Sequence, residues 1–302
     1  MISNIFKQPI IILSAPRSGS TFLFETLSKG NELWTIGGES HAVIEGMPQL
    51  CPGYKDSISN ELTEHDADPK TIEQLKFRFQ SLLKNNEGKT YSEEINGPIR
   101  FLEKTPKNAL RIRFLSKVFP DAKFIYLVRD PKENISSMID AWNSKHFITY
   151  PYLPNFKNRW SLVLLPNWPS LVNKTNHEIA TQQWKVCNST ILEELKKLPE
   201  DKWEITNYSD LIDNPDQEIS KLCRFIGINK NENFPELGKN ELPLSEFTLT
   251  EPKKNKWHKN AHLLASQMNQ LETLIDDINL ELSRSNATKI NNVIALDNVK
   301  NN

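Results

Sequence analysis

The sequence has few cysteines and no clear excess of charge of either sign. Its three cysteines, Cys51, Cys187 and Cys223, lie far apart and form no CxxC pair, which argues against a disulfide scaffold. No metal-ligand spacing occurs among these cysteines and the six histidines, so we predict a protein without a metal. Basic residues number 37 and acidic residues 38, whereas a broad nucleic-acid surface needs a strong basic excess. We therefore expect no nucleic-acid partner and only a local anion site.

The sequence also has no long apolar run near its start. The run from Pro9 to Leu13 is too short for the core of a signal peptide or for a membrane span. We therefore predict no transmembrane segment and a cytoplasmic protein, and the oligomeric state stays open. A hydrophobic fraction of 38% with 25% charged residues over 302 residues is typical of a globular enzyme with a sizeable core.

Apolar runs that look like buried strands alternate with helical patterns along the chain. The predicted strands lie at residues 9–13, 101–105, 123–128 and 203–205. Such alternation implies a parallel sheet with right-handed crossovers. We predict one α/β domain over residues 1–283, with a central parallel sheet flanked by helices in a P-loop-like arrangement. Residues 284–302 are polar and rich in Asn, so we expect a disordered tail there.

A turn rich in small residues follows the first predicted strand and precedes a helix. The helix N-terminus leaves backbone N–H groups unpaired and attracts anions, while Gly19 allows a close approach and Arg17 adds a permanent cation. A Walker A loop needs a second glycine and a lysine that are absent here, so an ATP or GTP site is disfavoured. The alternative interpretation is an ordinary helix cap made by Ser20 and Thr21.

A second candidate anion site follows the third predicted strand. Arg129 ends that strand, and Ser137 follows eight positions later on the next helix. An arginine can bind a phosphate through two hydrogen bonds. The alternative is a turn at the strand end with a local ion pair.

These two segments, in this order, resemble the PAPS-dependent sulfotransferase family, in which PAPS is 3′-phosphoadenosine-5′-phosphosulfate. The motifs are most similar to those of the tyrosylprotein-type and related bacterial enzymes. The resemblance implies that the 5′-phosphosulfate is held by Arg17, Ser18, Gly19, Ser20 and Thr21. It also implies that Arg129 and Ser137 bind the 3′-phosphate, and that Tyr208, in a Tyr-Ser-Asp-Leu stretch, contacts the adenine.

The resemblance also indicates catalytic residues. Glu39, in a Gly-Gly-Glu-Ser-His stretch, corresponds to the family's catalytic base, with His41 as its rival and Glu45 as a weaker alternative. Lys104 would contact the bridging or sulfuryl oxygens, and Arg17 would stabilise charge on the leaving phosphate.

The implied reaction moves a sulfuryl group from PAPS to an acceptor hydroxyl, or alternatively an amine, by in-line displacement that releases 3′-phosphoadenosine-5′-phosphate (PAP). An ATP-dependent kinase and a nucleotide-binding module without turnover are the competing hypotheses. The acceptor could be a small molecule, a glycan, a lipid or a peptide. The aromatic stretch 147–168 is either a wall of the acceptor pocket or a packing surface. The basic segment 253–259 either closes over the nucleotide or is a solvated charge run.

Overall fold

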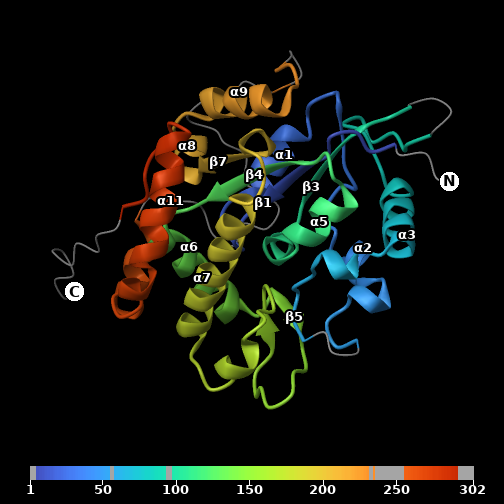
Figure 1. The fold of residues 1–302 in the computed structure, drawn as a ribbon. Coiled ribbons are helices and arrows are strands. Elements are labelled where there is room, and N and C mark those ends of the chain that lie inside the picture. The colour runs from blue at the N-terminus through green and yellow to red at the C-terminus, as the bar shows by residue number, and fades with distance from the viewer. Residues whose placement is uncertain (1–4, 55–57, 93–96, 231–233, 235–254, 292–302) are drawn as a thin grey trace.

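Five parallel strands form the central sheet, in the order β2-β3-β1-β4-β7 (Figure 1). The computed structural model describes residues 5–54, 58–92, 97–230, 234 and 255–291. The strands are β1 (Ile10–Leu13), β2 (Leu33–Trp34), β3 (Arg100–Lys104), β4 (Lys123–Val128) and β7 (Trp203–Asn207). The predicted α/β fold with a central parallel sheet is confirmed. Within the central sheet, the sequence did not predict β2, because two residues are too short to show a period.

Helices cover both faces of this sheet (Figure 1). They are α1 (Ser20–Leu27), α2 (His41–Glu45), α3 (Pro69–Gln80), α5 (Ile112–Val118), α6 (Pro131–Ser144), α7 (Asn176–Leu195), α8 (Tyr208–Asp213), α9 (Pro215–Ile226), α10 (Ala261–Leu264) and α11 (Glu272–Arg284). The side chains of β1 alternate between two hydrophobic cores. Ile10 and Ile12 pack in the core formed with α1, α8 and α9. Ile11 and Leu13 pack in the larger core, which is formed with α3, α5, α6, α7 and α11. Burial on both faces explains the continuous apolar strand sequences.

Side-chain caps fix where the two longest helices next to the sheet begin. The carboxylate of Asp130 accepts hydrogen bonds from the backbone N–H groups of Lys132 and Glu133 at the start of α6. Thr175 and Glu178 form a reciprocal capping box at the start of α7. The Asp130 cap starts α6 at Pro131, so Arg129 lies in the short turn between β4 and α6.

The insertion between α6 and α7 contains a small antiparallel pair, β5 (Ile148–Tyr150) and β6 (Trp160–Ser161). Three of its aromatic side chains, Phe156, Trp160 and Trp168, form a buried cluster with Trp142 of α6. Trp160 stacks edge-on against Trp142 and Trp168, with ring centroids 5.3 and 6.4 Å apart, and all three rings are buried. Of the two interpretations of the aromatic stretch, pocket wall or packing surface, packing is therefore the correct one for these rings.

The chain beyond α11 packs back onto the domain, unlike the disordered tail that we expected from residue 284. The backbone N–H of Thr288 donates to Asp210, that of Ile290 donates to Asn279, and the Ile290 side chain is buried. The segment is polar on average, but its apolar residue Ile290 packs against the domain and holds the segment there. Residues 292–302 lie outside the described part of the chain.

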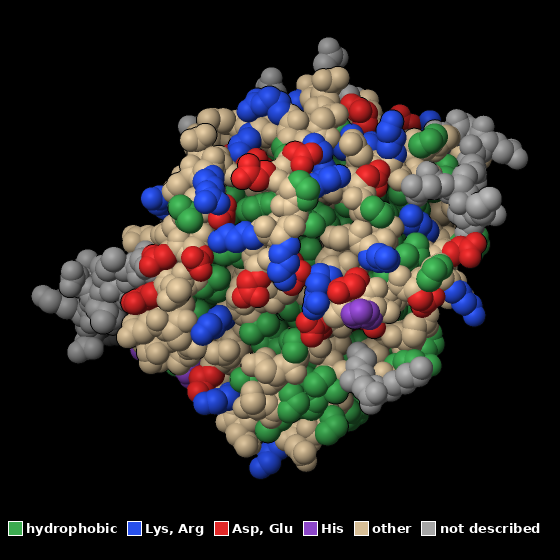
Figure 2. Space-filling view, viewed as in Figure 1, with side chains coloured by type: hydrophobic (Ala, Val, Ile, Leu, Met, Phe, Trp, Pro, Cys, Tyr) green, Lys and Arg blue, Asp and Glu red, His purple; other side chains and the backbone are tan. Residues whose placement is uncertain are grey.

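Acidic and basic side chains are interspersed over the face shown in Figure 2, in keeping with the near-zero net charge. Cys51, Cys187 and Cys223 are free thiols. Within the described ranges, no helix combines the length and the apolar character needed to cross a bilayer.

Candidate active site

The turn between β1 and α1 has the backbone shape of an anion-binding loop. Arg17 and Gly19 both have positive φ angles, of 65° and 91°. Gly19 is the residue before α1 and offers no side chain to cap the first N–H groups of the helix. The helix start therefore presents backbone donors and a positive partial charge to whatever lies in front of it.

Asn134 on α6 holds this loop in place. Its amide donates to the Pro16 carbonyl at 2.8 Å and accepts from the Ser18 hydroxyl at 2.8 Å. The Ser18 hydroxyl also contacts the carbonyl of Ala15 at 2.8 Å, and the Ser18 side chain is buried. The side chain of Ser18 therefore shapes the loop and does not line the cavity, and the predicted part of Ser18 in holding the phosphosulfate stays a prediction.

Arg129, at the end of β4, lies beside the loop. One of its terminal nitrogens donates to the Arg17 carbonyl at 3.2 Å, and the other lies 3.4 Å from Glu133. Its guanidinium also stacks over the Tyr208 ring, 4.6 Å from the centroid. The Nε atom of Arg129 is buried and has no hydrogen-bond partner among the described residues. Arg129 thus forms the local ion pair with Glu133, and its Nε–H remains as a donor for an anion.

Tyr208 lies against the first loop. A Cβ atom at position 19 would overlap the Tyr208 ring, so the close packing of this ring requires a glycine there. The ring is thus packed between Gly19 and the Arg129 guanidinium. This arrangement joins the two candidate anion sites through one aromatic side chain.

One cavity of about 360 Å³ contains both candidate anion sites. Its lining includes these predicted residues: Arg17, Gly19, Ser20, Thr21, Glu39, His41, Arg129, Ser137 and Tyr208. A ligand in this cavity could contact the start of α1 and the start of α6 at the same time. The two places that were predicted from separate sequence segments therefore share one cavity.

The two arginines of the cavity make it strongly attractive to anions. Burial, and then the neighbouring Arg129 guanidinium, lower the pKa of Arg17. The Arg17 guanidinium also packs over the Phe147 ring, 4.7 Å from the centroid. Two like charges held close together in a partly buried place are stabilised when an anion lies between them.

Glu39 also lines the cavity, next to Lys104 and His41. Its carboxylate accepts a hydrogen bond from Lys104 Nζ at 2.7 Å, and His41 Nδ1 is 3.4 Å away. Burial raises the pKa of Glu39, but the His41 hydrogen bond and the Lys104 charge outweigh it, so the pKa lies below its usual range. Glu39 is therefore deprotonated near neutral pH, as a proton acceptor must be.

Lys104 lies behind the cavity wall rather than on it. Its side chain is only 2% exposed, and Nζ also donates to Thr21 Oγ1 at 3.1 Å. The sequence predicted direct contact with the reacting group, but here Lys104 joins two residues that line the cavity, Glu39 and Thr21. Strand position alone does not show whether a terminal side chain is covered by the loops around it.

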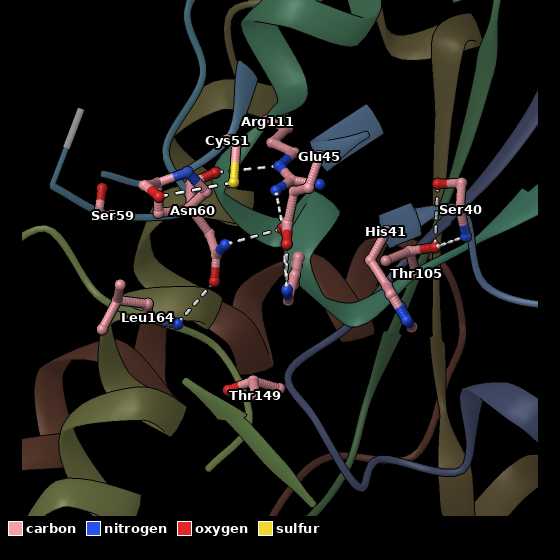
Figure 3. Close-up of polar contacts among 12 residues, drawn as sticks. Ser40, His41, Glu45, Cys51, Ser59, Asn60, Thr105, Arg111, Thr149 and Leu164 are labelled. Atoms are coloured by element: carbon pink, nitrogen blue, oxygen red, sulfur yellow. Dashed lines mark hydrogen bonds and ion pairs between the residues drawn. The ribbon is translucent and has the colours of Figure 1, made fainter. Parts of the chain in front are cut away.

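Glu45, the weaker candidate for the base, takes part in a buried network instead. Its carboxylate binds Arg111 at 2.6 Å and accepts a hydrogen bond from the Asn60 amide (Figure 3). Lys107 Nζ, at 2.8 Å, and the Tyr150 hydroxyl also contact it. Burial raises the pKa of Glu45, but Arg111 and Lys107 lower it by more. Glu45 does not line the cavity, so it is poorly placed to accept a proton from a ligand there.

The rest of the cavity wall combines apolar and polar groups that sequence reasoning found only in part. The predicted aromatic stretch contributes Phe147, Ile148, Thr149, Leu162 and Val163, while its tryptophans face the core. The basic segment contributes Lys256 and Trp257, whereas residues 253–254 lie outside the described residues. Lys107, Glu133 and Asp140 also line the cavity, and no motif had marked them. In the described part of the chain, no group of His, Cys, Asp or Glu side chains is arranged to hold a metal ion.

Comparison with known proteins gives one family match and several similar folds. The family model described as "Sulfotransferase family" matches residues 9–232. The sulfotransferase domain from the curacin biosynthetic pathway is 20% identical, with 86% of this chain and 98% of that chain covered and a TM-score of 0.48. A sulfotransferase from Alicyclobacillus acidocaldarius is 14% identical, with 89% and 96% covered and a TM-score of 0.48. A mouse sulfotransferase complexed with PAP is 17% identical, with 76% and 62% covered and a TM-score of 0.38. No curated protein matches.

Proposed function

The chain belongs to the sulfotransferase family, and on that basis we propose that it transfers a sulfuryl group from PAPS to an acceptor hydroxyl and releases PAP. The observation that carries this proposal is the single cavity that both anion sites line. PAPS carries a phosphosulfate at its 5′ end and a phosphate at its 3′ position. A molecule with two separate anionic groups suits a cavity that both candidate anion sites line.

In the proposed reaction the acceptor oxygen attacks sulfur, and the bond between sulfur and the oxygen of the 5′-phosphate breaks. Glu39 accepts the acceptor's proton, because it is deprotonated and lines the cavity. Arg17 and the N-terminus of α1 stabilise the charge that develops on the leaving phosphate. Arg129 and Ser137 bind the 3′-phosphate, which fixes the donor relative to Glu39. Tyr208 contacts the adenine or the adjoining sugar.

The acceptor lies, in this proposal, against the wall formed by Phe147, Ile148, Leu162 and Val163. Lys107 also lines this region, but its Nζ is held by Glu45 at 2.8 Å, a carboxylate that it shares with Arg111. This wall therefore suits the uncharged, apolar part of a molecule that carries a hydroxyl group. Small molecules, glycans, lipids and peptides can all present such a group, and a cytoplasmic location stays a prediction.

Ligand-dependent thermal unfolding tests the donor assignment. PAP without magnesium should stabilise the protein by about 2.7 kcal/mol at roughly 100 times its Kd, because a ligand of the folded state alone adds that free energy. ATP with magnesium should give little stabilisation, since the loop has no Walker A lysine. Stronger stabilisation by ATP and magnesium would instead support a kinase.

Transfer itself is tested with radiolabelled PAPS and a panel of phenols, aliphatic alcohols, sugars and tyrosine peptides. The proposal expects label in at least one hydroxyl acceptor. Tight PAP binding with no labelled product in any class would support a nucleotide-binding module without turnover.

A further inference from the structure

The turn that carries Glu39 is attached to the end of β3 at two consecutive residues. Glu39 accepts a hydrogen bond from Lys104 Nζ at 2.7 Å, and the backbone N–H of the next residue, Ser40, donates to Thr105 Oγ1 at 2.7 Å. Figure 3 shows Ser40 and Thr105 facing one another, with His41 at the start of α2 beside them. Neighbouring residues of the turn thus bind neighbouring residues of the strand end.

The Thr105 hydroxyl has a double role that depends on its chemistry. It accepts the hydrogen bond from Ser40 N–H and donates its own proton to Glu103 Oε1 at 2.7 Å. A hydroxyl has one proton and two lone pairs, so it can do both at once. The Ser40 hydroxyl donates to the same Glu103 oxygen at 2.5 Å, which closes a ring of three side chains.

Glu103 is a buried carboxylate, with only 2% of its surface exposed. Its other oxygen accepts from the Asn108 amide at 2.5 Å, so its three hydrogen-bond donors are all neutral groups. Burial raises the pKa of Glu103, and these donors oppose that effect. Burying a carboxyl group here costs more free energy than burying an apolar side chain, so its presence points to a geometric role.

We propose that Glu103, Thr105 and Ser40 form a positioning clamp that holds Glu39 against Lys104 at the edge of the cavity. None of these three residues lines the cavity, so they act through Glu39 rather than on a ligand. The clamp adds a positioning role to the proposed function. It depends on that function in one respect, the assignment of Glu39 as the base. The contact between Glu39 and Lys104 can be measured without any donor or acceptor.

Among the described residues, the charged groups that face Glu39 come from three segments. They are Lys104 on β3, His41 on α2 and Arg17 in the loop before α1. His41 and Lys104 both lower the pKa of Glu39, and Lys104 is the nearer of the two, so a longer distance from Lys104 to Glu39 would weaken its effect. Loss of the clamp would let the turn move away from Lys104 and would raise the pKa of Glu39.

The test compares Thr105→Val, which has almost the same shape but no hydroxyl, with Thr105→Ser, which keeps the hydroxyl. The pKa of Glu39 is read from the carboxyl carbon by NMR, and the signal is assigned by its loss in Glu39→Gln. We expect Thr105→Val to raise the titration midpoint by about one pH unit, because a nearby cation lowers a carboxyl pKa by about that amount. Thr105→Ser should titrate like the wild type.

An unchanged midpoint in a folded Thr105→Val protein would overturn the clamp. If that variant does not fold, Ser40→Ala replaces it, since it removes only the hydroxyl that binds Glu103 and keeps the backbone donor. An upward shift supports the clamp in that variant also, and no shift overturns it. Calorimetry with PAP on the wild type is run in parallel. A wild type that fails to bind PAP contradicts the proposed function and leaves the result on the clamp intact.

Discussion

Glu39 combines, in one side chain, the exposure and the charge state that the proposed chemistry needs. It is 22% exposed and borders the cavity, whereas its partner Lys104 is almost completely covered. His41 is more exposed, at 48%, and also lines the cavity. Both residues can therefore reach an acceptor, and the low pKa favours Glu39 as the group that is free to accept a proton at neutral pH.

Substitution at these two positions separates their roles. Glu39→Gln should reduce sulfuryl transfer about a hundredfold or more, because that is the usual contribution of a general base. The affinity for PAP, measured by calorimetry, should be nearly unchanged, since Glu39 is assigned to the acceptor. His41→Ala should reduce transfer far less. If Glu39→Gln retains activity and His41→Ala abolishes it, the base is His41.

Several site residues could be predicted from the sequence because a loop motif fixes their local geometry. The first loop and Arg129 follow β1 and β4, so their positions at the sheet edge follow from the strand pattern. Ser137 lies on α6, the helix that begins after Arg129. The covered position of Lys104 and the core-facing tryptophans depend on tertiary packing. Lys107 and Asp140 carry no motif, so only the folded chain shows that they border the cavity.

At the scale of elements, the Glu45 network holds α2 against the insertion. Glu45 ends α2, Tyr150 belongs to β5, and Arg111 precedes α5, yet all three meet at one carboxylate. Asn60 adds hydrogen bonds both to Glu45 and to the Tyr150 hydroxyl. The apolar wall of the cavity and the turn with Glu39 are thus joined to one buried network.

Glu45→Gln should lower the free energy of unfolding by about 3 kcal/mol, because it leaves the buried charges of Arg111 and Lys107 without their partner. Chemical denaturation measures this change. Glu61→Gln is the matched control, since Glu61 is 41% exposed and pairs with Arg113 at 3.6 Å. That exposed pair should contribute less than about 1 kcal/mol. Equal effects of the two substitutions would contradict the role of the network.

The same network makes a prediction about pH. The pKa of Glu45 is lower in the folded protein than in the unfolded chain, so its ion pairs add stability above the unfolded value of about 4.3. That stability is lost as the pH falls through the lower, folded value. Denaturation at a series of pH values should therefore show a steeper acid loss in the wild type than in Glu45→Gln. Parallel pH profiles would contradict this assignment.

The elements themselves were largely predictable, and the errors have physical causes. The apolar spacing over residues 261–282 predicts one helix, but the structure interrupts it. Helix α10 ends at Leu264, and α11 begins at Glu272 after a tight turn, Met268–Leu271. Apolar residues continue at helical spacing through this break, and three of them, Leu264, Leu271 and Ile275, are buried. The spacing of apolar residues indicates which face of a segment is buried, but it does not show where the helical backbone is interrupted.

At the scale of the whole molecule, the parallel sheet explains why distant segments meet. Strands β1, β3 and β4 are neighbours and run in the same direction, so the residues that follow them gather at one edge. The first loop, Lys104 and Arg129 come from these three strands. A site at the carboxyl edge of a parallel sheet is the arrangement that the strand order favours.

The central claim is that two anion sites bind opposite ends of one nucleotide. Calorimetry with PAP and with 5′-AMP, which lacks the 3′-phosphate, tests it in the wild type, in Arg129→Ala and in Arg284→Ala. Arg284 is 63% exposed and outside the cavity, so it is the charge-matched control. Arg129→Ala should weaken PAP binding at least about tenfold, as loss of a charge-assisted hydrogen bond implies, and should leave 5′-AMP nearly unaffected. Equal losses for both nucleotides, or no loss for PAP, would contradict the account.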